Sequence, residues 1–155
     1  MQGALYTRDF LERGIVEEPA WASLTQEETA ALKARLQSLF GAFPVRQKPV
    51  EGVTEQDLIY PVLLALGWSD LLVQQQVSRR RRDDVPDALL FADATQKKAA
   101  NSERDAHWRY RHGLAIVEAK RWERALDRAD AQGTPSSQML RYLRRADESS
   151  DGHLE

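Results

Sequence analysis

The sequence has no cysteine, which excludes disulfide bonds, thiolate metal sites and a thiol nucleophile. Long hydrophobic runs are also missing: an apolar run such as Val62–Leu66 is far shorter than the roughly 20 residues that a membrane-spanning helix needs. The N-terminus has no basic region followed by an apolar one, which is the pattern of a secretory signal. We therefore expect a cytoplasmic protein that has no membrane partner.

Neither sign of charge dominates, because 22 lysines and arginines stand against 24 aspartates and glutamates, a formal net charge of -2. An autonomous DNA-binding protein of high affinity commonly carries a large positive excess. Any contact with nucleic acid must therefore be local. The length of 155 residues and the hydrophobic share of 42% are typical of a globular fold with a modest core.

The front of the chain has a helical pattern. Thr25 and Glu28 have the spacing of a capping box, and Gly41 and Pro44 end the apolar stripe that follows. Residues 5–24, before this helix, predict a short helix and a turn. The apolar stripe consists of Leu32, Leu36, Leu39 and Phe40.

A linker is expected after this helix, because residues 43–53 contain two prolines and one glycine. We divide the chain accordingly into a helical N-terminal lead with its linker, residues 1–50, and a second domain over residues 51–153. The last two residues, Leu154 and Glu155, have the sequence of a vector-derived junction before a histidine tag, and we leave them out of the fold.

A second helix is expected over residues 54–68. Thr54 is placed to cap it, and Gly67 is placed to end it. Pro61 lies inside the pattern and predicts a kink or a late helix start, because proline cannot donate the backbone hydrogen bond. The apolar positions at helical spacing are Leu58, Ile59, Val62, Leu63 and Leu66.

Strand and helix signals alternate in the rest of the chain. Extended stretches rich in branched apolar residues lie at 71–77, 85–92 and 114–120. The polar segment 93–113 predicts a helix or a long loop. Two more helices are expected, at 123–131 and 136–146. This order of elements predicts an α/β sandwich with a mixed sheet.

Charged side chains lie on otherwise apolar faces of two of these predicted strands. Side chains two residues apart share a face, so Glu118 and Lys120 lie with Ile116, and Asp87 lies with Leu89. Two converging carboxylates beside a lysine make an oxygen-ligand site suited to Mg²⁺, which waters and a substrate phosphate complete. In such a site the metal lowers the pKa of a bound water, and the lysine stabilises the transition state.

This arrangement resembles the PD-(D/E)xK nuclease superfamily, with Pro86-Asp87 as the first motif and Glu118-Ala119-Lys120 as the second. The segment 54–68 is similar to the opening helix of nuclease domains in type I restriction subunits and type IIG restriction-modification enzymes. Residues 136–143 resemble their later helix with its Gln-x-x-x-Tyr pattern. Residues 6–21 are similar to the N-terminal lead of type IIG proteins that carry a methyltransferase domain downstream.

The resemblance implies a restriction-endonuclease-like sandwich, in which helices flank a mixed central sheet, and an endonuclease domain truncated at its C-terminal edge. It also implies hydrolysis of DNA phosphodiester bonds with Mg²⁺, for which Mn²⁺ can substitute. Asp87 and Glu118 would bind the metal and Glu55 would join them. Lys120 would assist the attacking water, and Gln138 would act in catalysis or contact DNA. The implied partners are double-stranded DNA and the methyltransferase and target-recognition domains of the same full-length chain.

Each of these candidates also has a plainer structural interpretation. Glu118 and Lys120 would then form a strand-end ion pair, and Asp87 would be a turn residue. An acid at position 55 is favourable in the first turn of a helix for the dipole alone. Gln138 would be a partly buried polar residue. At the level of the whole chain, the rivals are a non-catalytic DNA-binding or docking module of the same fold in front of a methyltransferase, and a plain helical interaction domain.

A basic run between the first two extended stretches is a further candidate. Arg79, Arg80, Arg81 and Arg82 suit phosphate oxygens and predict DNA contact. Two aspartates follow at once, so a charged hairpin turn is the alternative. The histidines have no ligand spacing, and no zinc site is expected.

Overall fold

The computed structural model describes residues 7–73, 85–126, 128–129 and 133–149. The chain divides into two compact units, Met1–Ser38 and Leu39–Glu155. The boundary lies inside the longest helix, α2, which spans Gln26–Ala42. In the part of the chain that is described, no helix is both long and apolar enough to cross a membrane.

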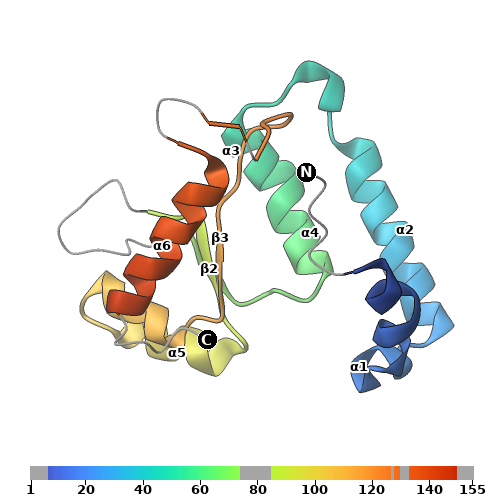
Figure 1. Ribbon diagram of the computed structural model, residues 1–155, viewed down its shortest axis with the longest axis horizontal. Helices are drawn as coiled ribbons and strands as arrows, with labels where there is room; N and C mark the ends of the chain where they lie inside the picture. The colour runs from blue at the N-terminus through green and yellow to red at the C-terminus, as the bar shows by residue number, and fades with distance from the viewer. Residues whose placement is uncertain (1–6, 74–84, 127, 130–132, 150–155) are drawn as a thin grey trace. The chain divides into compact units, whose positions relative to one another are not determined.

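Short helical turns and most of α2 make up the first unit, as expected for this stretch (Figure 1). The predicted capping box is confirmed: the hydroxyl of Thr25 accepts the N–H of Glu28 at 3.1 Å, and the Glu28 carboxylate accepts the N–H of Thr25 at 2.9 Å. No side chain described in residues 7–38 is buried. The turns before α2 are η1 (Phe10–Gly14), η2 (Ile15–Glu17) and α1 (Pro19–Ala22).

A continuous helical segment opens the site-bearing part of the second unit. It runs from α3 (Glu51–Thr54) through the π-helical turn η4 (Glu55–Ile59) into α4 (Tyr60–Ala65). The wide turn directly precedes Pro61, whose ring nitrogen cannot donate to the preceding turn, and the Tyr60 N–H bonds the carbonyl of Glu55. The irregularity expected at this proline is therefore present.

The expectation that Thr54 caps this segment is wrong. The helix begins one turn earlier, after Val50, whose backbone is extended with φ -66° and ψ 166°. Thr54 is buried inside the helix, where its hydroxyl donates to the carbonyl of Val50 at 3.1 Å. The same hydroxyl oxygen accepts the N–H of Trp122 at 3.3 Å. Thr54 thus connects this helix by a hydrogen bond to the segment around Trp122, which follows the third strand.

In the part of the chain that the structure describes, three short strands form the sheet. They are β1 (Leu71–Val73), β2 (Ala88–Leu90) and β3 (Ala115–Val117), in that order. Each lies inside a stretch that was expected to be extended. The described strands pair only antiparallel, so the expectation of a mixed sheet is wrong for them. Continuous apolar runs indicate burial on both faces and do not distinguish the two pairings. The register aligns Leu72, Leu89 and Ile116 on one face.

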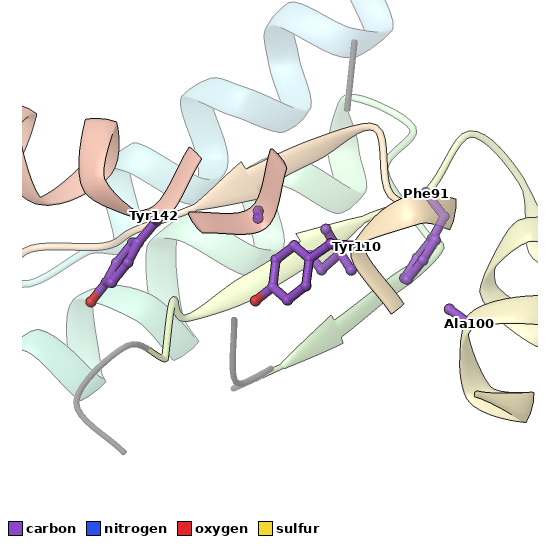
Figure 2. Close-up of a cluster of buried hydrophobic side chains, with 6 residues drawn as sticks. Phe91, Ala100, Tyr110 and Tyr142 are labelled. Carbon is purple, nitrogen blue, oxygen red and sulfur yellow. The ribbon is translucent and has the colours of Figure 1, made fainter. Parts of the chain in front are cut away.

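The core lies between this face of the sheet and the helices of the C-terminal part (Figure 2). Helix α6 (Pro135–Ser149) contributes Tyr142 and Ala146. The polar segment after β2 contributes the fully buried Ala100 and Tyr110, from α5 (Ala94–Ser102) and the 3-10 helix η5 (Ala106–His112). This segment is therefore a structural part of the core as well as a connection.

Two further expectations differ from the structure. The described residues of 123–131 form no helix, because Glu123 has a left-handed backbone with φ 66° and the Arg124 N–H closes a turn onto the carbonyl of Arg121 at 3.1 Å. Residues 43–53 pack rather than act only as a linker. The ring centroids of the buried Phe43 and of Trp122 lie 5.3 Å apart, so this segment packs within the second unit.

Candidate active site

The pairing of β2 with β3 places the two acidic motifs opposite each other. Ala88 pairs with Val117, so one step further along both strands brings Asp87 opposite Glu118. Alternation puts Asp87 on the face of Leu89, the face that α6 covers. The strand register alone thus makes neighbours of two carboxylates that are distant in sequence.

Asp87 is held by the backbone of the neighbouring strand. Its Oδ2 accepts the N–H of Ala119 at 2.5 Å. Burial raises the pKa of Asp87 to about 6; the Ala119 hydrogen bond acts against this, and the negative charges of Glu118 and Glu55 add to it. A cation placed beside this carboxylate would therefore relieve an unfavourable local field.

Glu118 lies at the centre of a hydrogen-bond network. Its side chain is 7% exposed, and its Oε1 accepts the ammonium of Lys120 at 2.5 Å and the side-chain amide of Gln138 at 2.7 Å. The same amide nitrogen lies 2.7 Å from the hydroxyl of Tyr142, which packs in the core. Within the described residues, the buried Glu118 Oε2 has no hydrogen-bond partner. One carboxylate oxygen is thus held in place while the other is left without a donor.

The charges of Glu118 and Lys120 are set by burial and by each other. Burial raises the pKa of Glu118, and its contact with Lys120 opposes this. Burial lowers the pKa of Lys120, but the hydrogen bond to Glu118 and the charge of that carboxylate outweigh it, so the pKa is raised overall. Lys120 therefore remains an ammonium at neutral pH and serves as a cation and a donor rather than as a base.

These side chains share one cavity of about 390 Å³. Four of the residues that the sequence predicts for the site line it: Asp87, Glu118, Lys120 and Gln138. The turn after β3 adds Arg121 and Arg124 to the wall, which sequence reasoning did not assign to the site. The order Lys-Arg-x-x-Arg after the second motif was the signal for them. Acids, an amide and cations are therefore gathered around a space that water and a small anionic group can enter.

Glu55 is placed differently from the expectation. It is not among the side chains that line the cavity, because its carboxylate accepts the hydroxyl of Tyr60, whose oxygen also lies 3.2 Å from the carbonyl of Asp87. Glu51, one turn earlier, lines the cavity instead, and its charge acts to raise the pKa of both Glu118 and Lys120. Glu51 was missed because the helix was expected to begin at Thr54.

The donor set fits Mg²⁺ with a small number of protein ligands. Asp87 and Glu118 are opposed on adjacent strands, and Glu118 Oε2 is a buried acceptor without a donor. Mg²⁺ is commonly bound through one or two carboxylates, with waters and substrate phosphates in the remaining positions. No group of three or more histidine, aspartate or glutamate side chains is placed to hold a metal within the described ranges. Glu55 is therefore not needed for this fit.

The basic run and the histidines of the segment after β2 remain to be placed. Arg79, Arg80, Arg81 and Arg82 lie outside the described residues. His112 pairs with Glu103 at 2.9 Å, and His107 is buried beside the ring of Trp108. Both histidines thus have structural surroundings in the segment after β2.

Comparison with known proteins assigns no family. No family model matches the chain, and neither a curated protein nor a solved structure matches it. What the protein does must therefore be inferred from its own residues.

Proposed function

We propose that the chain is the Mg²⁺-dependent endonuclease domain of a type IIG-like restriction-modification protein, and that it hydrolyses DNA phosphodiester bonds. The observation that carries this proposal is the cavity of about 390 Å³ in which Asp87, Glu118, Lys120 and Gln138 meet. Residues next to the ends of β2 and β3 and one residue of α6 supply these side chains, and the strand register continues to place the two acids opposite each other.

Each side chain has a task that follows from its surroundings. Asp87 and Glu118 would hold the metal, which when bound would supply a water of lowered pKa and offset charge on the scissile phosphate. Lys120 remains an ammonium, so it would donate hydrogen bonds to the attacking water or to the phosphate. Gln138 orients Glu118 through the 2.7 Å bond to its Oε1 and leaves Oε2 available.

The cationic wall fits an anionic substrate. Arg121 and Arg124 line the same cavity as the acids, and guanidinium groups suit phosphate oxygens. The near-neutral net charge of the whole chain keeps this attraction local. We therefore expect weak cleavage with little sequence preference from this chain alone, because few phosphates are contacted.

Plasmid nicking by the full chain with Mg²⁺ or Mn²⁺ tests the proposal, with Lys120→Met as the probe. This change keeps the length of the side chain and removes its charge, so nicking should fall by about two orders of magnitude or more while Mn²⁺ still binds. Lys98→Met, at an exposed position of α5, is the matched control and should nick like the unchanged protein. Equal nicking by the two variants would remove Lys120 from the mechanism.

A second function is favoured by one specific observation. Asp87 and Glu118 Oε1 already have donors from Ala119, Lys120 and Gln138, so much of the network is satisfied without a metal. This is what a non-catalytic DNA-binding or docking module of the same fold would need. Such a module would bind DNA in EDTA and show no metal-dependent nicking at any protein concentration, which separates it from the nuclease.

A further inference from the structure

A second cavity, of about 280 Å³, borders the turn that follows Lys120. Residues 48–50 form one wall, and Arg121, Trp122 and Glu123 form the other. Arg121 lines this cavity and also the cavity that holds the acids. An extended polyanion could therefore contact Arg121 and reach into both spaces.

The two walls carry an unusual backbone. Among the described residues other than glycine, Lys48 and Glu123 are the two in the left-handed region, with φ of 47° and 66°. Lys48 follows the 3-10 helix η3 (Val45–Gln47), where a left-handed cap is common. Glu123 is the third residue of the turn that the Arg124 N–H closes onto Arg121 at 3.1 Å, a position with positive φ that glycine usually fills. The turn thus keeps a carboxylate where the backbone favours glycine, and such outliers gather at functional sites.

Trp122, which lies between Arg121 and Glu123, is held in place by two contacts. The N–H of Trp122 is held by the hydroxyl of Thr54 at 3.3 Å, and its ring packs against Phe43 with centroids 5.3 Å apart. The flanking Arg121 and Glu123 are exposed. The turn therefore has a fixed centre, and its charged side chains project from a defined position.

The ion pair between Lys48 and Glu123, which line the second cavity, can be broken at little cost in stability. Lys48 Nζ lies 3.5 Å from Glu123 Oε2, and the side chains are 76% and 57% exposed. Exposed ion pairs contribute little to stability because water screens them. A phosphate is a strong acceptor for an ammonium and a guanidinium. An incoming phosphate can therefore replace Glu123 as the partner of Lys48.

We propose that this second cavity binds a backbone phosphate of the DNA strand next to the scissile phosphate, with Arg121 as the shared contact and Lys48 exchanged from Glu123 to the phosphate. The inference rests on the proposed function and extends it to the path of the strand. A chain of linked phosphates is favoured over free phosphate or a mononucleotide, because Arg121 borders both cavities. Glu123 then acts as a stand-in anion that keeps the empty subsite ordered.

The salt dependence of DNA binding tests this subsite without cleavage. Binding of the full chain to a fluorescent duplex is measured by anisotropy in EDTA over a series of salt concentrations. Lys48→Gln, at a side chain that lines the second cavity and not the cavity with the acids, should weaken binding several-fold regardless of sequence and reduce the slope of log K against log salt by about 0.9, the value of one phosphate contact. Arg104→Gln, an exposed arginine that lines neither cavity, is the matched control and should leave the slope unchanged.

Two substitutions of Glu123 separate the effect of its charge from the effect of its left-handed backbone. Glu123→Gln keeps the strained turn and Glu123→Gly relieves it, but both remove the anion that competes for Lys48. Both should therefore tighten duplex binding two-fold or more. Inorganic phosphate should displace the duplex no better than chloride of equal ionic strength; strong displacement by phosphate alone would overturn the strand assignment in favour of a free-anion site.

The outcomes distinguish this inference from the nuclease proposal. If nicking is absent but Lys48→Gln lowers the slope, the subsite stands in a binding module and the catalytic proposal fails. If nicking is present but Lys48→Gln behaves like Arg104→Gln, the subsite is wrong and the catalytic proposal survives. No measurable duplex binding at low salt, or weaker binding by both Glu123 variants, would also overturn the subsite.

Discussion

Asp87→Asn should stabilise the metal-free protein at neutral pH, although it removes a charged site residue. Asparagine keeps an oxygen that can accept the Ala119 N–H, so the 2.5 Å contact has a substitute. The substitution also removes the negative charge of Asp87, which is unfavourable in the folded protein because of burial and the neighbouring acids. The carboxyl has a pKa of about 6 in the folded protein against a reference value of 3.8.

The size and the pH window of this effect follow from those two values. A shift of about 2 units corresponds to an upper limit of about 3 kcal/mol, and screening at this half-buried position reduces the expected gain to about 1 kcal/mol. Because the folded pKa is raised, the wild-type protein is favoured with Asp87 protonated and loses that stability as the pH rises from 3.8 to about 6. The advantage of asparagine should therefore be small at pH 4 and complete at pH 7.5.

Urea unfolding in EDTA, followed by tryptophan fluorescence at pH 4 and pH 7.5, measures this difference. Asp57→Asn, at an exposed position of η4, is the matched control and should show no comparable gain at either pH. An Asp87→Asn protein that is less stable than wild type at pH 7.5 would refute the reasoning. So would a difference that is the same at both pH values, because the gain would then not come from the carboxylate charge.

Two further predictions concern the metal and the packing. Mn²⁺ at ten times its dissociation constant should stabilise the wild-type protein by about 1.4 kcal/mol, a rise of a few degrees in Tm, and the rise should vanish in Asp87→Asn; an equal rise in both proteins would exclude Asp87 as a ligand. Gly113→Ala should lower Tm clearly, because the new Cβ would lie 2.4 Å from Leu89 Cδ1 in the fully buried core; an unchanged Tm would mean that the core yields at this point.

The features that could be predicted are those that local chemistry decides. The capping box of Thr25 and Glu28 needs only neighbours in sequence, and it is present. The strand segments follow from runs of apolar residues, and alternation places Asp87 with Leu89 on the covered face. For these elements the residue pattern itself carries the information.

The features that could not be predicted depend on contacts between distant segments. Helix α3 begins at Glu51, one turn before the expected cap, in a segment whose Phe43 packs on the distant Trp122, so Glu51 was not placed at the cavity. The turn at Glu123 is held by the bond from Trp122 to Thr54, which no local propensity encodes. Arg121 lies in this turn, so its place in the cavity wall could not be predicted without it.

The segment between β2 and β3 links the packing of the core to the geometry of the site. Lengthening a loop costs little chain entropy, about 0.6 kcal/mol for each doubling, so the long connection is no obstacle to strand pairing. Yet Ala100 and Tyr110 from this connection are fully buried in the same core cluster as Leu89, which lies two residues from Asp87. The strand pairing that places the two carboxylates opposite each other is thus packed against this connection. A substitution that loosens this connection should therefore disturb the placement of the two acids as well as the core.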